Sequence, residues 1–129
     1  MPEEWEIYLA KAEESLRVAQ SAKDRGQTNS AANRSYYAAY LAEYAALAKL
    51  APFRVSPTGG THKTVVEAFN ARLVVKGNVF ESWIVQGVTQ LSGLRVKADY
   101  TSQDVTAAEA KECVTMAKKI VQKIGKHLR

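Results

Sequence analysis

The chain reads Ala31-Ala32-Asn33-Arg34-Ser35-Tyr36-Tyr37-Ala38-Ala39-Tyr40 in its first third, mixing small residues with three tyrosines and one arginine. At helical spacing, Tyr36 and Tyr40 fall on one stripe, whereas Tyr37 and Tyr44 fall on another. A helix with apolar residues on two stripes packs against neighbours on more than one side. The stretch therefore predicts the central helix of a helical bundle, with alanines that allow its neighbours to come close.

Helices are also predicted on both sides of this one. The central helix should start at a capping residue among Thr28, Asn29 and Ser30 and run to about Leu50. Two prolines and two glycines within residues 51–60 predict a loop before a helix capped by Thr61. The expected helices cover residues 3–23, 28–50, 61–76, 80–98 and 107–128, the last one opened by the capping box Thr106-Ala107-Ala108-Glu109.

No segment shows the two-residue alternation of a half-buried strand. We therefore predict an all-α fold, an antiparallel up-and-down bundle of four to five helices that forms a single domain over residues 1–129. The one cysteine, Cys113, cannot form an intrachain disulfide, and no secretory signal pattern opens the sequence. No apolar run reaches the roughly 20 residues that cross a bilayer. We expect a cytoplasmic protein without a membrane segment.

The formal net charge of +5 is unevenly distributed along the chain. Glutamates gather near the start, and the basic residues near the end are Lys118, Lys119, Lys123, Lys126 and Arg129. One interpretation is that these charges complement the helix dipoles. The other is that the basic last helix attracts an anionic partner such as nucleic acid.

The composition argues against several kinds of catalytic site. One cysteine and two histidines are too few for the usual zinc sites, and neither His62 nor His127 follows a glutamate by three positions as a di-metal bundle requires. The sequence contains no Gly-x-x-x-x-Gly-Lys phosphate loop. Cys113 lies on the apolar face of the last predicted helix, where a thiol is typically inert. We therefore expect no metal and no cofactor.

A set of polar residues remains that could form a site. An arginine among apolar and aromatic residues on a core-facing helix needs a partner, and Arg95 can pair with Asp99 four positions later. If the set converges, guanidinium groups can bind the oxygens of a phosphate or nucleotide. The alternative is a structural arginine-aspartate pair that fixes the register of the helices. The set comprises Arg34, Tyr37, His62, Arg95, Asp99 and Tyr100.

The order of these motifs resembles the HEPN superfamily over nearly the whole chain. The resemblance rests on the 31–40 stretch, on His62 at a loop-to-helix junction, and on Leu94-Arg95-Val96-Lys97-Ala98-Asp99-Tyr100 before the last helix. It is similar above all to small prokaryotic members that carry an arginine and paired tyrosines on the second helix. The resemblance implies a helical bundle, frequent homodimers, and a minimal nucleotidyltransferase as partner, often in a toxin-antitoxin pair.

Many HEPN proteins are metal-independent ribonucleases in which a histidine follows an arginine by four to six positions. Here the residue five positions after Arg95 is Tyr100. A phenol, with an ordinary pKa of about 10, is a poor general base at neutral pH.

The sequence thus favours a non-catalytic module that pairs with a nucleotidyltransferase. Such a module would bind a nucleotide or RNA phosphate, and the candidate binding residues are Arg34, Tyr37, His62, Arg95 and Asp99. The alternative is a degenerate ribonuclease toxin that uses Arg95 with Tyr100 or His62.

Overall fold

A computed structural model describes residues 1–52 and 61–129, and these residues form helices and no strand. The elements are α1 (Glu4–Asp24), α2 (Thr28–Leu50), α3 (Thr61–Phe69), the π-helix η1 (Asn70–Lys76), α4 (Trp83–Tyr100) and α5 (Ala107–Leu128). The prediction of an all-α bundle is confirmed. Most of the predicted 51–60 loop lies outside the described residues.

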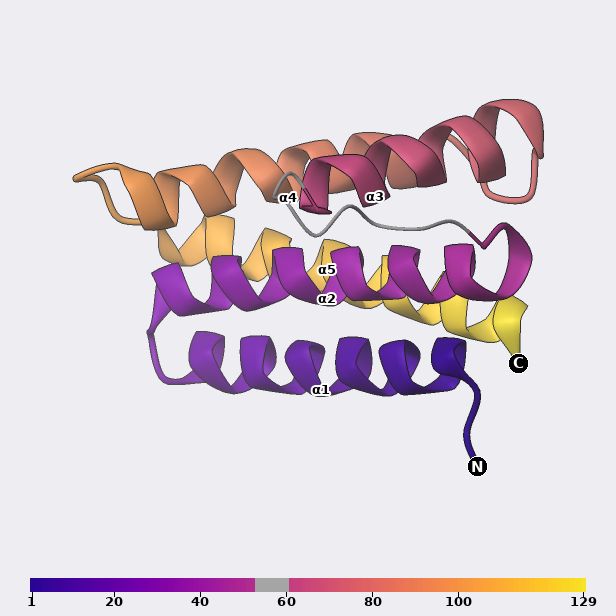
Figure 1. The fold of residues 1–129 in the computed structure, drawn as a ribbon. Coiled ribbons are helices and arrows are strands. Elements are labelled where there is room, and N and C mark those ends of the chain that lie inside the picture. The colour runs from indigo at the N-terminus through magenta and orange to yellow at the C-terminus, as the bar shows by residue number, and fades with distance from the viewer. Residues whose placement is uncertain (53–60) are drawn as a thin grey trace.

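Helix α2 occupies the centre of the bundle, as its two apolar stripes predicted. Figure 1 shows α1 running antiparallel to α2 on one side, with α3, η1 and α4 on the other side and α5 behind. Helix α2 contacts α1, α3, α4 and α5. Side chains on nearly every face of α2 are therefore held by a neighbouring helix, so α2 is the element on which a site can be built.

Alanines let the other helices approach α2 closely. Seven alanines of α2 have no exposed surface: Ala31, Ala32, Ala38, Ala39, Ala42, Ala45 and Ala46. A hydrogen bond adds to the α1–α2 contact, because the Ser15 hydroxyl donates to the Arg34 carbonyl at 2.9 Å. Since that carbonyl lies one residue from Asn33 and three from Tyr37, this contact helps to fix the part of α2 that carries the candidate site.

The helix ends follow the sequence signals in most places. Gly26 has φ +74 in the α1–α2 turn, the left-handed conformation that glycine adopts without strain. The capping box of Thr106 and Glu109 is formed at the start of α5. Three expectations were wrong by a few residues: α2 begins at Thr28 after Gln27, so none of Thr28, Asn29 and Ser30 caps it; Thr61 is the first residue of α3 rather than its cap; and α4 begins at Trp83 rather than at Phe80. Local pattern does not determine where the last turn frays.

The third predicted helix changes its winding at Asn70. Helix α3 ends at Phe69 and continues as the π-helix η1, which the three-and-four spacing did not predict. Leu73 is buried, and its carbonyl accepts hydrogen bonds from the backbone amides of Val79 and Phe80. These bonds fold the chain back toward α4, which then runs antiparallel to α3 (Figure 1).

Helices α4 and α5 are joined by a close approach and by an ion pair. A Cβ at Gly87 would lie 2.6 Å from the Met116 sulfur, so a larger residue there would require the Met116 side chain to move. Lys97 Nζ lies 2.8 Å from Glu109 Oε1, connecting the end of α4 to the start of α5. Within residues 1–52 and 61–129, no helix has both the length and the apolar character needed to span a bilayer.

Candidate functional site

Arg95 projects from α4 toward the tyrosines of α2. Its guanidinium carbon lies 5.1 Å from the Tyr36 ring centroid and 5.4 Å from that of Tyr37. On the outer side, the same carbon is 5.7 Å from the Tyr100 ring, and Arg95 Nη2 donates to the Tyr100 hydroxyl at 3.5 Å. Arg95 is therefore surrounded by aromatic faces, which attract a cation through their quadrupoles.

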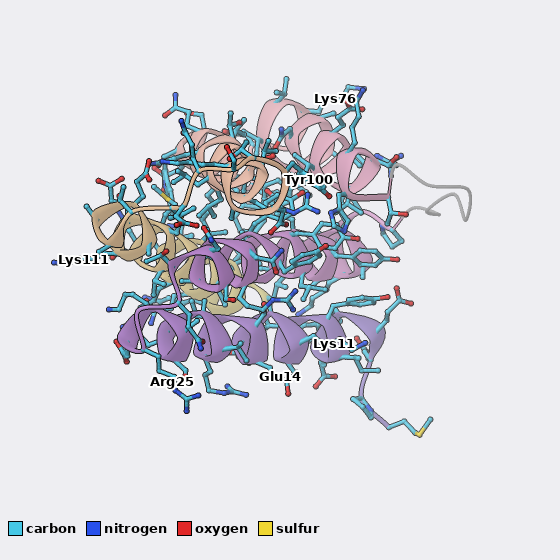
Figure 2. All side chains as sticks on the ribbon, turned by 90° about the vertical axis from the view of Figure 1, so that its left-hand side faces the viewer. Lys11, Glu14, Arg25, Lys76, Tyr100 and Lys111 are labelled. Carbon is cyan, nitrogen blue, oxygen red and sulfur yellow. The ribbon has the colours of Figure 1, made fainter. Side chains whose placement is uncertain are left out.

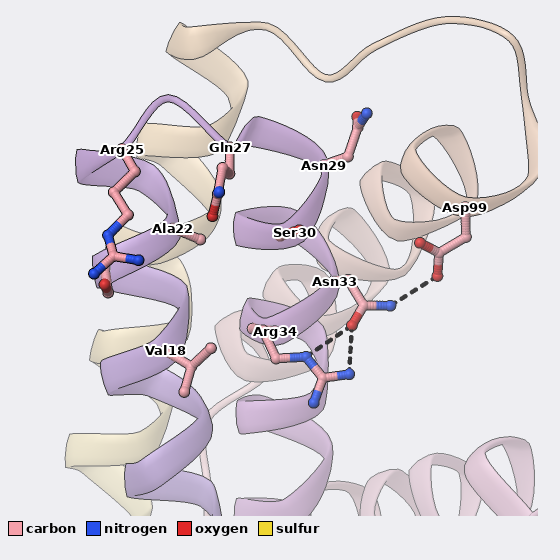
Figure 3. Close-up of a pocket in the computed structure, with 10 residues that line it drawn as sticks. Val18, Ala22, Arg25, Gln27, Asn29, Ser30, Asn33, Arg34 and Asp99 are labelled. Carbon is pink, nitrogen blue, oxygen red and sulfur yellow. Dashed lines mark hydrogen bonds between the residues drawn. The ribbon is translucent and has the colours of Figure 1, made fainter.

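A chain of polar contacts connects Arg95 to Arg34 across two helices. Arg95 Nε forms an ion pair with Asp99 Oδ2 at 3.4 Å without a hydrogen bond, and Asp99 Oδ2 accepts a hydrogen bond from Asn33 Nδ2 at 2.8 Å. Asn33 Oδ1 in turn accepts from Arg34 Nε at 2.9 Å and from Arg34 Nη2 at 2.6 Å. Figure 3 shows Asn33 between Arg34 and Asp99. The predicted pairing of Arg95 with Asp99 is confirmed, whereas the sequence analysis missed Asn33 as the link.

His62, in the first turn of α3, lies against the same tyrosines. Its ring centroid is 4.3 Å from that of Tyr40, 5.1 Å from Tyr37 and 5.8 Å from Tyr36. Burial lowers the pKa of His62, and the nearby charge of Arg95 lowers it further. The imidazole is therefore mainly neutral at pH 7, with a nitrogen lone pair that can accept a proton.

Tyr37 is the contact that the candidate residues share. Arg34 lies 4.8 Å from its ring centroid, close to the 5.1 Å of His62 and the 5.4 Å of Arg95. The structure thus brings together residues from three helices that are far apart in sequence. We call Arg34, Tyr37, His62, Arg95 and Asp99 the Tyr37 cluster.

The Tyr37 cluster is positive and partly open to solvent. It contains two guanidinium groups and one carboxylate, with a neutral histidine beside them. The Arg95 side chain keeps 18% of its surface exposed and that of Asp99 keeps 27%. Tyr100, which covers the Arg95 guanidinium, is 70% exposed.

A pocket of about 400 Å³ opens beside the cluster between α2, α3 and α4. Tyr36 and His62 form its wall toward the cluster, and Val66 and Val88 supply apolar surface. The Ser92 hydroxyl adds a polar group. A volume of this order accommodates a small organic group such as a nucleobase.

Glu43 is a buried carboxyl that the sequence analysis missed. It is 0% exposed, and neither carboxylate oxygen has a hydrogen-bond partner. Burial raises the pKa of Glu43 well above its ordinary value, which favours the protonated, neutral carboxyl. Its spacing contained the signal, because Glu43 follows Tyr36 by seven positions and lies on the same helical stripe.

Two other kinds of site, a reactive thiol and a metal centre, are not found among the residues that the structure describes. Cys113 is buried, and burial raises its pKa to about 11, which keeps the thiol protonated. In the described part of the chain, no group of three His, Cys, Asp or Glu side chains is placed to hold a metal ion.

The basic residues near the C-terminus are partly engaged with other side chains. Lys123 pairs with Glu81 at 3.5 Å, and Arg129 pairs with Glu13 at 2.8 Å. Such contacts reduce the positive charge that this end presents to a nucleic acid.

The chain matches a known protein family over most of its length. The family model described as HEPN domain matches residues 5–127. The chain belongs to this family. A search of curated proteins finds no match. The HEPN assignment covers all the helices described above, so the Tyr37 cluster lies inside the domain and not on an added segment.

In this HEPN domain the histidine nearest to Arg95 comes from a different helix. Tyr100 stands five positions after Arg95, and its hydroxyl accepts from the guanidinium. His62, on α3, lies near enough for the charge of Arg95 to lower its pKa. This arginine and this histidine therefore lie against the same two tyrosines, Tyr36 and Tyr37, although the local sequence after Arg95 contains no histidine.

Proposed function

We propose that this chain is a HEPN-type helical interaction module that pairs with a minimal nucleotidyltransferase and binds a nucleotide or RNA phosphate at the Tyr37 cluster. The convergence of Arg34, His62 and Arg95 on one tyrosine ring carries the proposal. Two planar guanidinium groups can donate paired hydrogen bonds to phosphate oxygens. The neighbouring pocket of about 400 Å³ gives the attached base a place to bind.

The phosphate would approach Arg95 from the side that Tyr100 covers. Asp99 already engages the Nε edge of Arg95, and Nη2 points toward the exposed Tyr100 hydroxyl. An incoming phosphate replaces that long 3.5 Å contact with shorter, charge-assisted bonds. Binding is therefore expected to depend on Arg95 and to change the environment of Tyr100.

Binding of AMP and of a short single-stranded RNA tests the phosphate part of the proposal. Arg95→Gln should weaken both by about tenfold or more, a loss typical of one charge-assisted pair. Arg95→Lys should rescue little, because a lysine lacks the planar fork. Lys111→Gln on α5 is the control, since it removes the same charge from an exposed lysine outside the cluster (Figure 2). Equal losses for Arg95→Gln and Lys111→Gln would contradict a specific site.

The partner is tested separately by a tagged pull-down from the native host at low salt. The proposal predicts recovery of a nucleotidyltransferase-like protein together with the tagged chain. Repeated failure to recover such a protein from cells that express both genes would count against the pairing. RNA carried along in the same experiment would support the phosphate site.

The position of His62 favours one alternative, a metal-independent ribonuclease. A neutral imidazole can take a proton from the ribose 2′-hydroxyl as its oxygen attacks the phosphorus and the 5′-oxygen leaves, while Arg95 stabilises the negative charge on the non-bridging oxygens. His62→Ala and Arg95→Ala should then each abolish cleavage, whereas Tyr100→Phe should retain most of it. Wild-type protein that leaves RNA intact at stoichiometric concentration excludes this alternative and leaves the binding module standing.

A further inference from the structure

A second groove, separate from the pocket beside His62, lies on the other side of the Asn33–Asp99 link. It has a volume of about 540 Å³ and runs between the end of α1 and the beginning of α2. Figure 3 shows Arg25 on its α1 side and Arg34 on its α2 side, with Val18 and Ala22 between them. Two arginines from different helices therefore face one open space.

The charges of this groove are unbalanced. Its one carboxylate belongs to Asp99, and that group is already engaged by Arg95 at 3.4 Å and by Asn33 at 2.8 Å. Arg25 makes no ion pair with any residue in the ranges 1–52 and 61–129. The groove thus presents two guanidinium charges while its acidic oxygens are occupied elsewhere.

Donors in the groove remain available for a ligand. Arg34 uses Nε and Nη2 on a single acceptor, Asn33 Oδ1, while a guanidinium group carries five N–H donors. The hydroxyls of Ser21 and Ser30 also line the groove. The first turn of α2 adds backbone amides, because Gln27 gives it no side-chain cap. These donors surround the space from both helices.

We propose that this groove is a second oxyanion site that binds a phosphate monoester. A phosphate monoester carries a charge of about −1.5 to −2 and three acceptor oxygens, which matches two guanidinium groups and the surrounding hydroxyls. A single carboxylate has one charge and two oxygens, which one arginine already satisfies. The volume of about 540 Å³ leaves room for the organic part of the ligand.

Occupation of the groove acts on the Tyr37 cluster through Arg34. Arg34 donates a hydrogen bond to Asn33, and Asn33 donates one to Asp99. Asp99 in turn forms an ion pair with Arg95 Nε. A phosphate that draws Arg34 away from Asn33 loosens each later contact in this chain. This coupling rests on the proposed function of Arg95, whereas binding in the groove does not.

Titration of the full chain with AMP, inorganic phosphate and citrate, followed by the side-chain Nε–H signals of the arginines in NMR, tests the site. Phosphate and AMP should shift the signals of Arg25 and Arg34 together, whether or not the Arg95 signal also shifts, and citrate should compete weakly. Arg25→Gln should raise the dissociation constant for inorganic phosphate, read from the Arg34 signal, at least fivefold. This side chain is exposed and makes no ion pair with a described residue, so its loss leaves the fold intact.

Arg17→Gln is the matched control, because it removes an exposed arginine from α1 outside the lining of this groove. An equal loss of affinity in Arg17→Gln and Arg25→Gln would show diffuse attraction and overturn the proposal, as would tight citrate binding. Arg95→Gln separates the two sites. It should leave the shift of the Arg25 signal in place even if the Tyr37 cluster binds nothing.

Discussion

Arg95 and Glu43 both lie near Tyr36, but their surroundings differ in solvent exposure and in the partners available to each side chain. Arg95 keeps 18% of its side chain exposed and has a carboxylate and three aromatic rings around it. Glu43 has no exposure and no hydrogen-bond partner. Tyr36 lies near both: burial raises its pKa most, the charge of Arg95 lowers it, and Glu43 raises it when the Glu43 carboxyl is ionised.

The difference shows what each residue can contribute. A guanidinium cannot lose its proton in a protein, so the fold must supply Arg95 with partners and a route to solvent. A carboxyl can become neutral, so Glu43 can be enclosed without a partner. Arg95 thus remains able to bind a ligand, whereas Glu43 contributes only through the stability of the folded state.

The largest expected effect comes from forcing a permanent charge into the Glu43 position. Glu43→Lys should destabilise the fold by several kcal/mol, on the order of 4 or more, because an unpaired ammonium is buried. Urea unfolding followed by circular dichroism measures the loss. Glu67→Lys on α3 is the control, since its carboxylate is 66% exposed and the change should stay within about 0.5 kcal/mol. Similar losses at both positions would contradict the burial of Glu43.

The next effect is the pH dependence that Glu43 imposes. The pKa of Glu43 is higher in the folded than in the unfolded state. Between these two pKa values the folded protein therefore binds up to one more proton than the unfolded chain. Stability should therefore fall by about 1.4 kcal/mol per pH unit from about pH 4.5 up to the folded pKa. Glu43→Leu should lose this slope, which denaturant titrations between pH 5 and 8 would show. A variant with the slope of the wild type would rule out Glu43 as its source.

A smaller effect is expected when Arg95 loses its carboxylate. Asp99→Ala should cost about 1 to 2 kcal/mol, because the charge left behind is only partly exposed. Replacing both Arg95 and Asp99 by leucine should be tolerated better than Asp99→Ala alone. Thermal and urea unfolding of the three variants provide the test. A double variant no more stable than Asp99→Ala would mean that the pair itself stabilises the register of α4.

The smallest effect is a shift in the titration of His62. Because Arg95 is the second cause of its lowered pKa after burial, Arg95→Gln should raise the pKa of His62 while leaving it below 6.5. NMR of the imidazole C–H signals measures this change. Arg34→Gln should have less effect, since Arg34 is not among the charges that act on His62. Equal shifts in the two variants would mean that the Arg95 charge does not act directly on His62.

Most of the fold followed from the sequence because its signals are local. The apolar stripes of α2 predicted a central helix, and its end at Leu50 was correct, although the predicted cap among Thr28, Asn29 and Ser30 is not formed. The capping box at Thr106 gave the start of α5 correctly. The π-helix could not be predicted, since its extra residue per turn depends on how Phe69 and Leu73 pack in the core.

The site was predictable as a set of residues but not as an arrangement. The pair of Arg95 and Asp99 followed from a spacing of four on one helix. The contact of His62 with Tyr37 depends on how α3 lies across α2, which no local pattern contains. Asn33 and Glu43 were missed because polar residues on a helix are ordinarily solvated. Only the packing of neighbouring helices shows that Glu43 is buried and that Asn33 bonds to Asp99.

The π-helix η1 is a segment in which this fold can lose a residue without displacing the helices around it. Its seven residues, Asn70–Lys76, hold more chain per turn than an α-helix does. Loss of one exposed residue there, such as Ala71, can be absorbed by rewinding the segment as α-helix. The same loss within α2 would rotate every later side chain by about 100° around the helix axis and separate the tyrosines from their partners. Insertions and deletions in related chains are therefore expected to collect in η1 and to spare α2.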